Sequence, residues 1–104
     1  MRDAQKCVRE LISTCQLETS PSIRCLDLIS EVGETAKELL KATDYGKTEI
    51  GSPTAAMEDE LGDCLFSLLA LCDALGVDAG QALEGALNKY RTRWETRGSV
   101  GSGR

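Results

Sequence analysis

Apolar residues recur every three or four positions along four stretches of the chain, the spacing of one face of an α-helix. The first stretch runs from about Asp3 to Leu17, and the second from Pro21 to about Ala42. The third follows Ser52-Pro53 and stops at Gly76, and the fourth runs from Asp78 to about Trp94. No stretch alternates apolar and polar residues over a strand length, so we predict an all-α fold resembling a four-helix bundle.

Local signals mark the ends of these stretches. Ser20-Pro21 and Ser52-Pro53 each place a capping hydroxyl before a proline at the first helical position. Asp78 precedes the fourth helix, with Gln81 three residues on as a capping-box partner. Residues 43–51 form a longer, glycine-containing loop between the second and third helices. We therefore predict one domain over residues 1–97 and a flexible glycine- and serine-rich tail over residues 98–104.

Aliphatic residues must form the core, because aromatic residues make up only 4% of the 104-residue chain. A core of this size is small, which is compatible with formation of an oligomer. The apolar face that we expect the second helix to bury consists of Ile23, Leu26, Ile29, Val32, Ala36, Leu39 and Leu40. The corresponding face of the third helix consists of Met57, Leu61, Cys64, Leu65, Leu68, Leu71, Cys72 and Leu75.

Two segments carry nearly the same acidic motif, Glu31-Val-Gly-Glu34 and Glu60-Leu-Gly-Asp63. In each, the carboxylates are three residues apart and share one helix face, at the edge of the expected apolar face. Packing of these two helices would bring four carboxylates together, and they would repel one another unless a cation held them. A glycine inside a helix costs about 1 kcal/mol relative to alanine. We expect Gly33 and Gly62 to allow either a close backbone approach or room for a ligand.

The available ligand atoms select the cation. The chain has no histidine and no C-x-x-C pair, which disfavours zinc and excludes the histidine-containing di-iron pattern. Carboxylate oxygens favour Mg²⁺, with Mn²⁺ as the other possibility. Bound Mg²⁺ commonly keeps several waters and serves a phosphate-bearing substrate. Glu38 extends the first acidic row by one turn, although Lys37 and Lys41 could instead neutralise it.

Charge and cysteine content narrow the function classes. A net charge of −5 argues against general nucleic-acid binding. Five cysteines, an odd number, suggest no disulfide framework and fit a reducing, cytoplasmic setting. We recognise neither a signal peptide nor an apolar stretch long enough to span a membrane. The last helix is rich in lysine and arginine toward its end, which suits a phosphate-bearing substrate or simply complements the helix dipole.

The acidic motifs resemble those of the MazG-type all-α nucleoside triphosphate pyrophosphohydrolases, and Asn88-Lys-Tyr-Arg-Thr-Arg93 resembles the basic segment of that family. The resemblance implies Mg²⁺-dependent hydrolysis of a nucleoside triphosphate to its monophosphate and pyrophosphate, as nucleotide-pool housecleaning. It also implies homodimers or homotetramers whose helices pack across subunits. The residues that it implies are the metal ligands Glu31, Glu34, Glu60 and Asp63, the phosphate-binding Lys89, Arg93 and Asn88, and Glu34 or Glu38 as the base that deprotonates the attacking water.

Other interpretations share these residues. Phosphoribosyl-ATP pyrophosphohydrolase and dimeric dUTPase have similar acidic helices, and only a substrate panel separates them. A non-enzymatic helical module could use the acidic row to bind a basic partner or a structural ion. A plain helical bundle with coincidental acidic residues is the third alternative. Tyr45, in the loop between the acidic helices, is the best candidate for a lid over a substrate.

Overall fold

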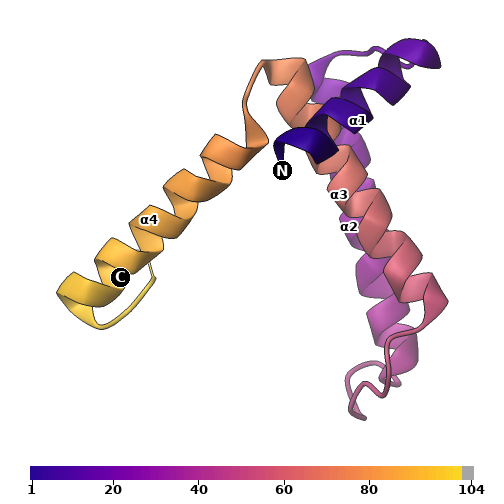
Figure 1. Cartoon of the computed structure of the whole chain (residues 1–104). Coiled ribbons are helices and arrows are strands. Elements are labelled where there is room, and N and C mark those ends of the chain that lie inside the picture. The colour runs from indigo at the N-terminus through magenta and orange to yellow at the C-terminus, as the bar shows by residue number, and fades with distance from the viewer. Residues whose placement is uncertain (102–104) are drawn as a thin grey trace.

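The computed structural model describes residues 1–101 and consists of four α-helices (Figure 1). The helices are α1 (Arg2–Thr14), α2 (Pro21–Ala42), α3 (Ala55–Leu75) and α4 (Ala79–Arg97). Residues 1–101 contain no strand, so the predicted all-α class is confirmed. No helix in this range combines the length and apolarity needed to cross a membrane. Residues 102–104 of the predicted flexible tail lie outside the described residues.

Three helix ends follow the predicted capping chemistry. The Ser20 hydroxyl accepts a hydrogen bond from the backbone N–H of Ile23 at 3.3 Å, ahead of the first turn of α2. The Asp78 carboxylate accepts one from the backbone N–H of Gln81 at 2.9 Å and caps α4. Gly76 ends α3 with a φ of 70°, in the left-handed region that favours glycine. These ends are determined by residues close together in the sequence.

The start of α3 differs from the prediction. The helix begins at Ala55 and its cap is Thr54, whose hydroxyl accepts a hydrogen bond from the backbone N–H of Met57 at 3.1 Å. The prediction that Ser52-Pro53 opens this helix was wrong by two residues. Thr54 offers the same kind of capping oxygen nearer to the apolar row, so the helix starts there.

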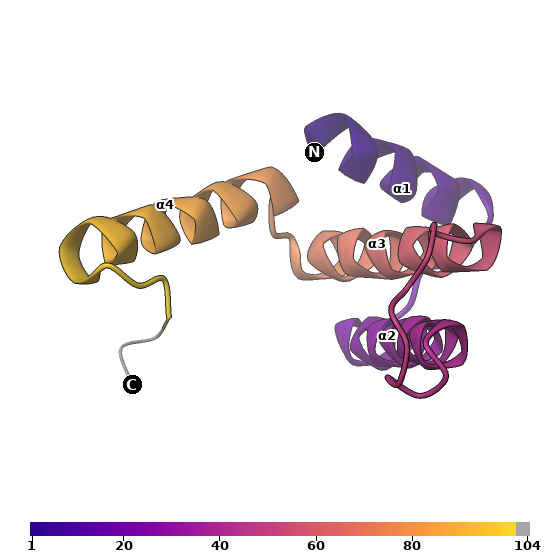
Figure 2. The same cartoon turned by 90° about the horizontal axis from the view of Figure 1, so that it is seen from below.

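Three of the helices form one packed layer around α3, with α1 on one side and α2 on the other (Figures 1 and 2). The loop of residues 43–54 reverses the chain, so α2 and α3 are antiparallel neighbours. Helix α4 instead departs from the end of α3 and diverges from the other helices. A complete four-helix bundle is therefore not formed within a single chain.

The side of α2 that packs against α3 is not the predicted apolar face. The buried and half-buried positions of α2 follow one helical row, namely Arg24, Leu28, Glu31, Thr35 and Glu38. The apolar residues Ile23, Leu26, Ile29 and Val32 are instead 45–63% exposed. The expectation that the carboxylates flank a buried apolar face is thus wrong for one chain. The acidic row itself faces α3, and the apolar row is left uncovered by residues 1–101.

The chain leaves an unusually large surface exposed. Its radius of gyration is 16.7 Å, whereas a compact chain of this length has about 13 Å. Its accessible surface is 7576 Å², against about 5,700 Å² for a typical monomer of this mass. Twenty-one large hydrophobic residues are at least 40% exposed. The chain therefore exposes large apolar faces that a further partner could cover.

Candidate functional site

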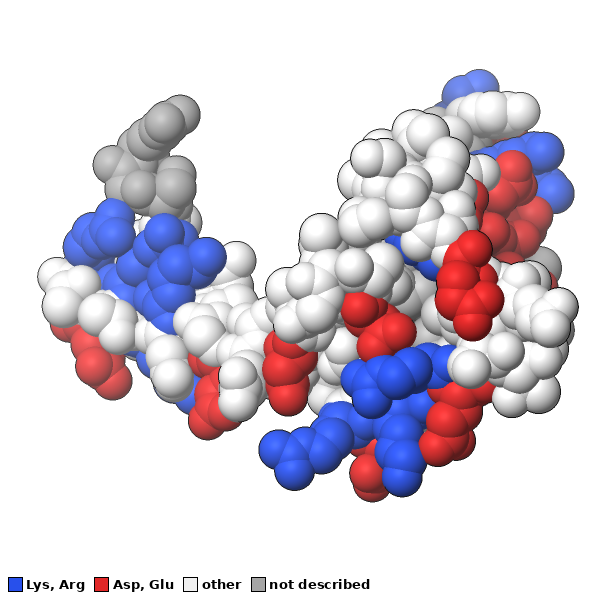
Figure 3. Space-filling view, turned by 90° about the horizontal axis from the view of Figure 1, so that it is seen from above, with Lys and Arg blue, Asp and Glu red and all other residues white. Residues whose placement is uncertain are grey.

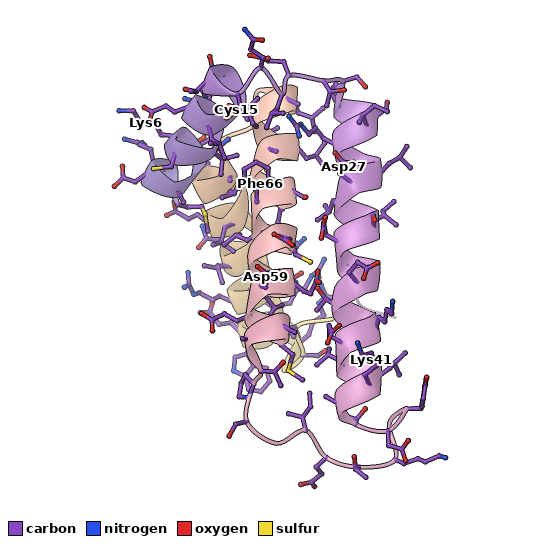
Figure 4. The ribbon with its side chains drawn as sticks, turned by 90° about the vertical axis from the view of Figure 1, so that its right-hand side faces the viewer. Lys6, Cys15, Asp27, Lys41, Asp59 and Phe66 are labelled. Carbon is purple, nitrogen blue, oxygen red and sulfur yellow. The ribbon has the colours of Figure 1, made fainter. Side chains whose placement is uncertain are left out.

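An acidic cluster lies between α2 and α3. Glu31 of α2 and Glu60 and Asp63 of α3 each offer a carboxylate oxygen, and these three oxygens lie within 4.8 Å of one another. The two helices run side by side (Figure 4), and Glu60 and Asp63 share one face because they are three residues apart. Glu31 and Glu60 are half-buried and Asp63 is exposed. The structure thus brings together three of the four carboxylates predicted as metal ligands.

The other two predicted acidic residues lie along the same helix, α2. Glu34 is exposed and is not part of the close group, but it lies near enough for its charge to affect Glu60. Glu38 is half-buried, and its Oε1 pairs with Nζ of Lys41 at 3.1 Å. The neutralising contact with lysine that was considered for Glu38 is therefore present. The structure shows no such ion pair for Glu34 among the described residues.

The electrostatics of the cluster show that its negative charges are crowded. The pKa of Glu60 is raised above its ordinary value, first by partial burial and then by the charges of its acidic neighbours. Those neighbours are Asp63, Glu31, Glu34 and Asp59. Ionising Glu60 is therefore less favourable here than for a free carboxyl group, and a bound cation would oppose that effect.

The three carboxylates fit a small divalent cation. In an octahedral Mg²⁺ site, opposite ligand oxygens are about 4.2 Å apart. Adjacent ligand oxygens in such a site are about 3 Å apart. The three carboxylate oxygens lie within 4.8 Å of one another, so the side chains would move closer together to bind one ion. Hard carboxylate oxygens are also the ligands that Mg²⁺ and Mn²⁺ prefer.

There is open space beside the acidic residues. A Cβ atom added at Gly33 or Gly62 would meet no neighbouring atom within 4 Å. A close backbone approach within the chain therefore does not explain these glycines, and room for a ligand remains the other expectation. Gly62 lines an open groove of about 420 Å³ together with Ala55, Glu58, Asp59 and Asp63.

The predicted phosphate-binding residues lie elsewhere, on α4. Lys89 and Arg93 flank the ring of Tyr90, with their charged groups 5.2 and 5.9 Å from its centre. The side-chain oxygen of Asn88 accepts a hydrogen bond from Nη1 of Arg91 at 3.3 Å. Figure 3 shows lysine and arginine side chains gathered on α4, well apart from the α2–α3 pair. Within one chain, the structure does not bring them to the acidic cluster.

A contact that the sequence analysis did not identify connects α2 and α3 beside the cluster. The Thr35 hydroxyl donates a hydrogen bond to the carbonyl oxygen of Glu31 at 3.0 Å, and lies 3.2 Å from Sγ of Cys64. Because the only hydroxyl proton is used in the first bond, the thiol of Cys64 is the donor in the second. Thr35 directly follows Glu34, and Cys64 directly follows Asp63. Their equivalent positions after the two acidic motifs were the available sequence signal for this contact.

An all-α chain with paired acidic motifs on two adjacent helices defines the class of protein, and the comparisons specify the family. Residues 20–98 match the MazG nucleotide pyrophosphohydrolase domain. The chain is also 30% identical over 78 residues to the uncharacterized protein YpjD of Bacillus subtilis (strain 168), covering 75% of this chain and 70% of that protein. No solved structure gives a significant match. The chain therefore belongs to the MazG nucleotide pyrophosphohydrolase domain family, which implies a nucleotide substrate.

Proposed function

We propose that the protein is a Mg²⁺-dependent nucleotide pyrophosphohydrolase, which converts a nucleoside triphosphate and water into a nucleoside monophosphate and pyrophosphate. The role is nucleotide-pool housecleaning. The observation that carries the proposal is the convergence of Glu31, Glu60 and Asp63 from two helices, with ligand oxygens within 4.8 Å. Family membership supplies the substrate class, and the groove lined by Gly62 supplies space beside the acidic residues.

The roles of the residues follow from their positions. Glu31, Glu60 and Asp63, with Glu34 one turn further along α2, would hold Mg²⁺. When bound, the ion would neutralise the carboxylates and bind phosphate oxygens and water. Glu34 is better placed than Glu38 to accept the proton of the attacking water, because Glu38 is paired with Lys41.

We also propose that the working form is a homodimer, alone or as half of a tetramer. The surface in excess of a typical monomer is about 1,900 Å² per chain, within the range that permanent dimers bury. A second copy offers the matching apolar faces, since the outward row of α2 and the exposed Leu83, Leu87, Tyr90 and Trp94 of α4 are present on both chains.

Charge complementarity indicates how the copies combine. The cluster on α2 and α3 is acidic, the outer part of α4 is basic, and α4 diverges from the α2–α3 pair within one chain (Figure 1). In the dimer that we propose, Lys89 and Arg93 of one copy approach the acidic cluster of the other and bind the phosphates of the substrate. The negative charge that develops on the phosphates during hydrolysis would be stabilised there.

The test is pyrophosphate release across all ribo- and deoxyribonucleoside triphosphates, together with phosphoribosyl-ATP, with and without Mg²⁺. We expect turnover that requires Mg²⁺, and a loss of about 100-fold or more in the Glu60→Gln variant, because binding of the metal contributes several kcal/mol to catalysis.

Glu10→Gln is the matched control, since Glu10 is an exposed carboxylate on α1 that belongs neither to the close group of three carboxylates nor to the groove beside it. Its activity should stay within about twofold of the wild type. Absence of Mg²⁺-dependent turnover for every substrate would favour the helical interaction module instead. Turnover of phosphoribosyl-ATP or dUTP alone would assign the chain to one of the related activities.

A further inference from the structure

The joint between α3 and α4 is held by one buried side chain, that of Gln5. Gln5 is only 5% exposed, although most of α1 around it faces solvent. Its Nε2 donates a hydrogen bond to the carbonyl oxygen of Val77 at 2.8 Å. Its Oε1 accepts one from the backbone N–H of Ala79 at 2.9 Å. A single amide thus satisfies an acceptor and a donor of the turn, as a peptide group would.

The turn does not satisfy these two groups by itself. Gly76 closes α3 through its own N–H, which donates to the carbonyl oxygen of Asp73 at 3.1 Å. Asp78 caps α4 through the N–H of Gln81. The N–H of Ala79 is one of the first in α4, and such groups lack a partner inside the helix. Gln5 supplies that partner from a helix more than seventy residues earlier in the sequence.

The angle of this joint determines where the far end of α4 lies. Apart from contacts around its first turn, such as Gly80 lying against Met1, α4 extends away from the other helices (Figures 1 and 2). Lys89 and Arg93 lie about 15 and 21 Å further along the axis than Ala79. A rotation of about 20° at the joint would therefore move Arg93 by about 7 Å.

We propose that Gln5 is a positioning residue for the phosphate-binding face of α4. Its amide fixes the direction in which α4 leaves α3, and so fixes where Lys89 and Arg93 meet the acidic cluster of a second copy. This inference rests on the proposed function. Displacements near 1 Å in an active site can lower the rate about 100-fold, so a joint held by two buried hydrogen bonds has direct consequences for the binding of nucleotide.

The Gln5→Met variant tests this role, because methionine has a similar length and volume but makes neither hydrogen bond. Gln81→Met is the matched control, since it is the same substitution at an exposed position of the same joint. The measurements are kcat and KM for the nucleoside triphosphate that the wild type hydrolyses fastest, and the melting shift caused by Mg²⁺ alone.

For Gln5→Met we expect a rise in KM of tenfold or more, with the Mg²⁺-induced melting shift unchanged, because the acidic cluster lies on other helices. Hydrogen exchange over residues 77–81 should be faster than in the wild type. If Gln5 only fills space, the methionine variant will keep the KM of the wild type, and that result would overturn the inference.

A second variant approaches the same joint from α4. Ala79→Pro removes the N–H that Gln5 accepts from, while proline suits the first position of a helix, so α4 still forms. It should raise KM like Gln5→Met, and an unchanged KM in this variant would also refute the role of Gln5. If the wild type itself releases no pyrophosphate, the proposed function fails and this role fails with it. Normal wild-type turnover with unaffected joint variants refutes the inference alone.

Discussion

The α2–α3 pair and α4 differ in how much they pack against other helices of the same chain. The two helices of the pair pack along their length within one chain and gather Glu31, Glu60 and Asp63 into one cluster, although the outward apolar row of α2 stays exposed. Helix α4 carries the predicted phosphate-binding residues but makes few contacts with the rest of its own chain. The comparison teaches that one chain assembles the acidic cluster but does not bring its own basic residues of α4 to it, which is why we propose that a second chain does so.

The sharpest way to break this comparison is to mix two inactive variants. We expect Glu60→Gln, and separately the double variant Lys89→Ala with Arg93→Ala, each to lose about 100-fold in activity. If α4 acts on the other copy, a mixed dimer contains one site with both halves intact. After subunits exchange at equal concentrations, pyrophosphate release should recover to about a quarter of the wild-type value.

The control for mixing is the formation of mixed dimers, shown by native mass spectrometry of differently tagged chains. Mixed dimers that form without any recovery would mean that α4 serves the acidic cluster of its own chain. The acidic cluster and the basic residues of α4 would then have to come together within one chain in the active form, unlike their arrangement in this structure.

A smaller effect is expected from a charge on the outward face of α2. Ile29 is 63% exposed and lies in the apolar row that faces away from α3. If a second copy covers this row, Ile29→Lys should weaken dimerisation at least about 30-fold, the size of a 2 kcal/mol interface residue. Sedimentation across a range of protein concentrations measures this effect, and activity should fall together with the dimer.

Asp27→Lys is the matched control, because Asp27 is an exposed residue near the opposite side of the same helix (Figure 4). It should dimerise like the wild type. An Ile29→Lys protein that remains dimeric would place the interface elsewhere, and a monomeric wild type would exclude the dimer.

The features that the sequence predicted correctly depend on neighbours along the chain. Ser20 and Asp78 cap their helices through N–H groups three residues away, so local pattern was enough to place α2 and the start of α4. The meeting of Glu31 with Glu60 also followed, since two antiparallel neighbouring helices bring repeated motifs together. Family resemblance was confirmed by the match over residues 20–98.

The features that sequence did not predict depend on what packs against what. Apolar pattern indicated that Leu26 and Ile29 would be buried, but pattern does not reveal whether the partner is in the same chain or another. The divergence of α4 was not predicted for the same reason, because the apolar pattern of α4 does not show which chain supplies its packing partner. The bonds of Gln5 to Val77 and Ala79 join segments far apart in sequence, and no local signal marks Gln5 as buried.

The central claim is that the acidic cluster binds a divalent cation, and thermal unfolding of the wild type and Glu60→Gln with and without Mg²⁺ tests it most directly. The raised pKa of Glu60 means that its ionised form is disfavoured in the folded state. Its contribution to stability therefore falls as pH rises from the ordinary carboxyl range through the raised pKa. At neutral pH without Mg²⁺, Glu60→Gln should consequently melt at a higher temperature than the wild type.

Mg²⁺ should reverse this order. At a hundredfold excess over Kd, binding stabilises the wild type by about 2.7 kcal/mol, which corresponds to roughly 10 °C for a chain of this size. Glu60→Gln should gain little, while Glu10→Gln, which alters an exposed carboxylate of α1, should respond like the wild type, all at matched ionic strength. A wild type whose melting temperature does not respond to Mg²⁺, or a Glu60→Gln protein that gains as much as the wild type, would contradict the account.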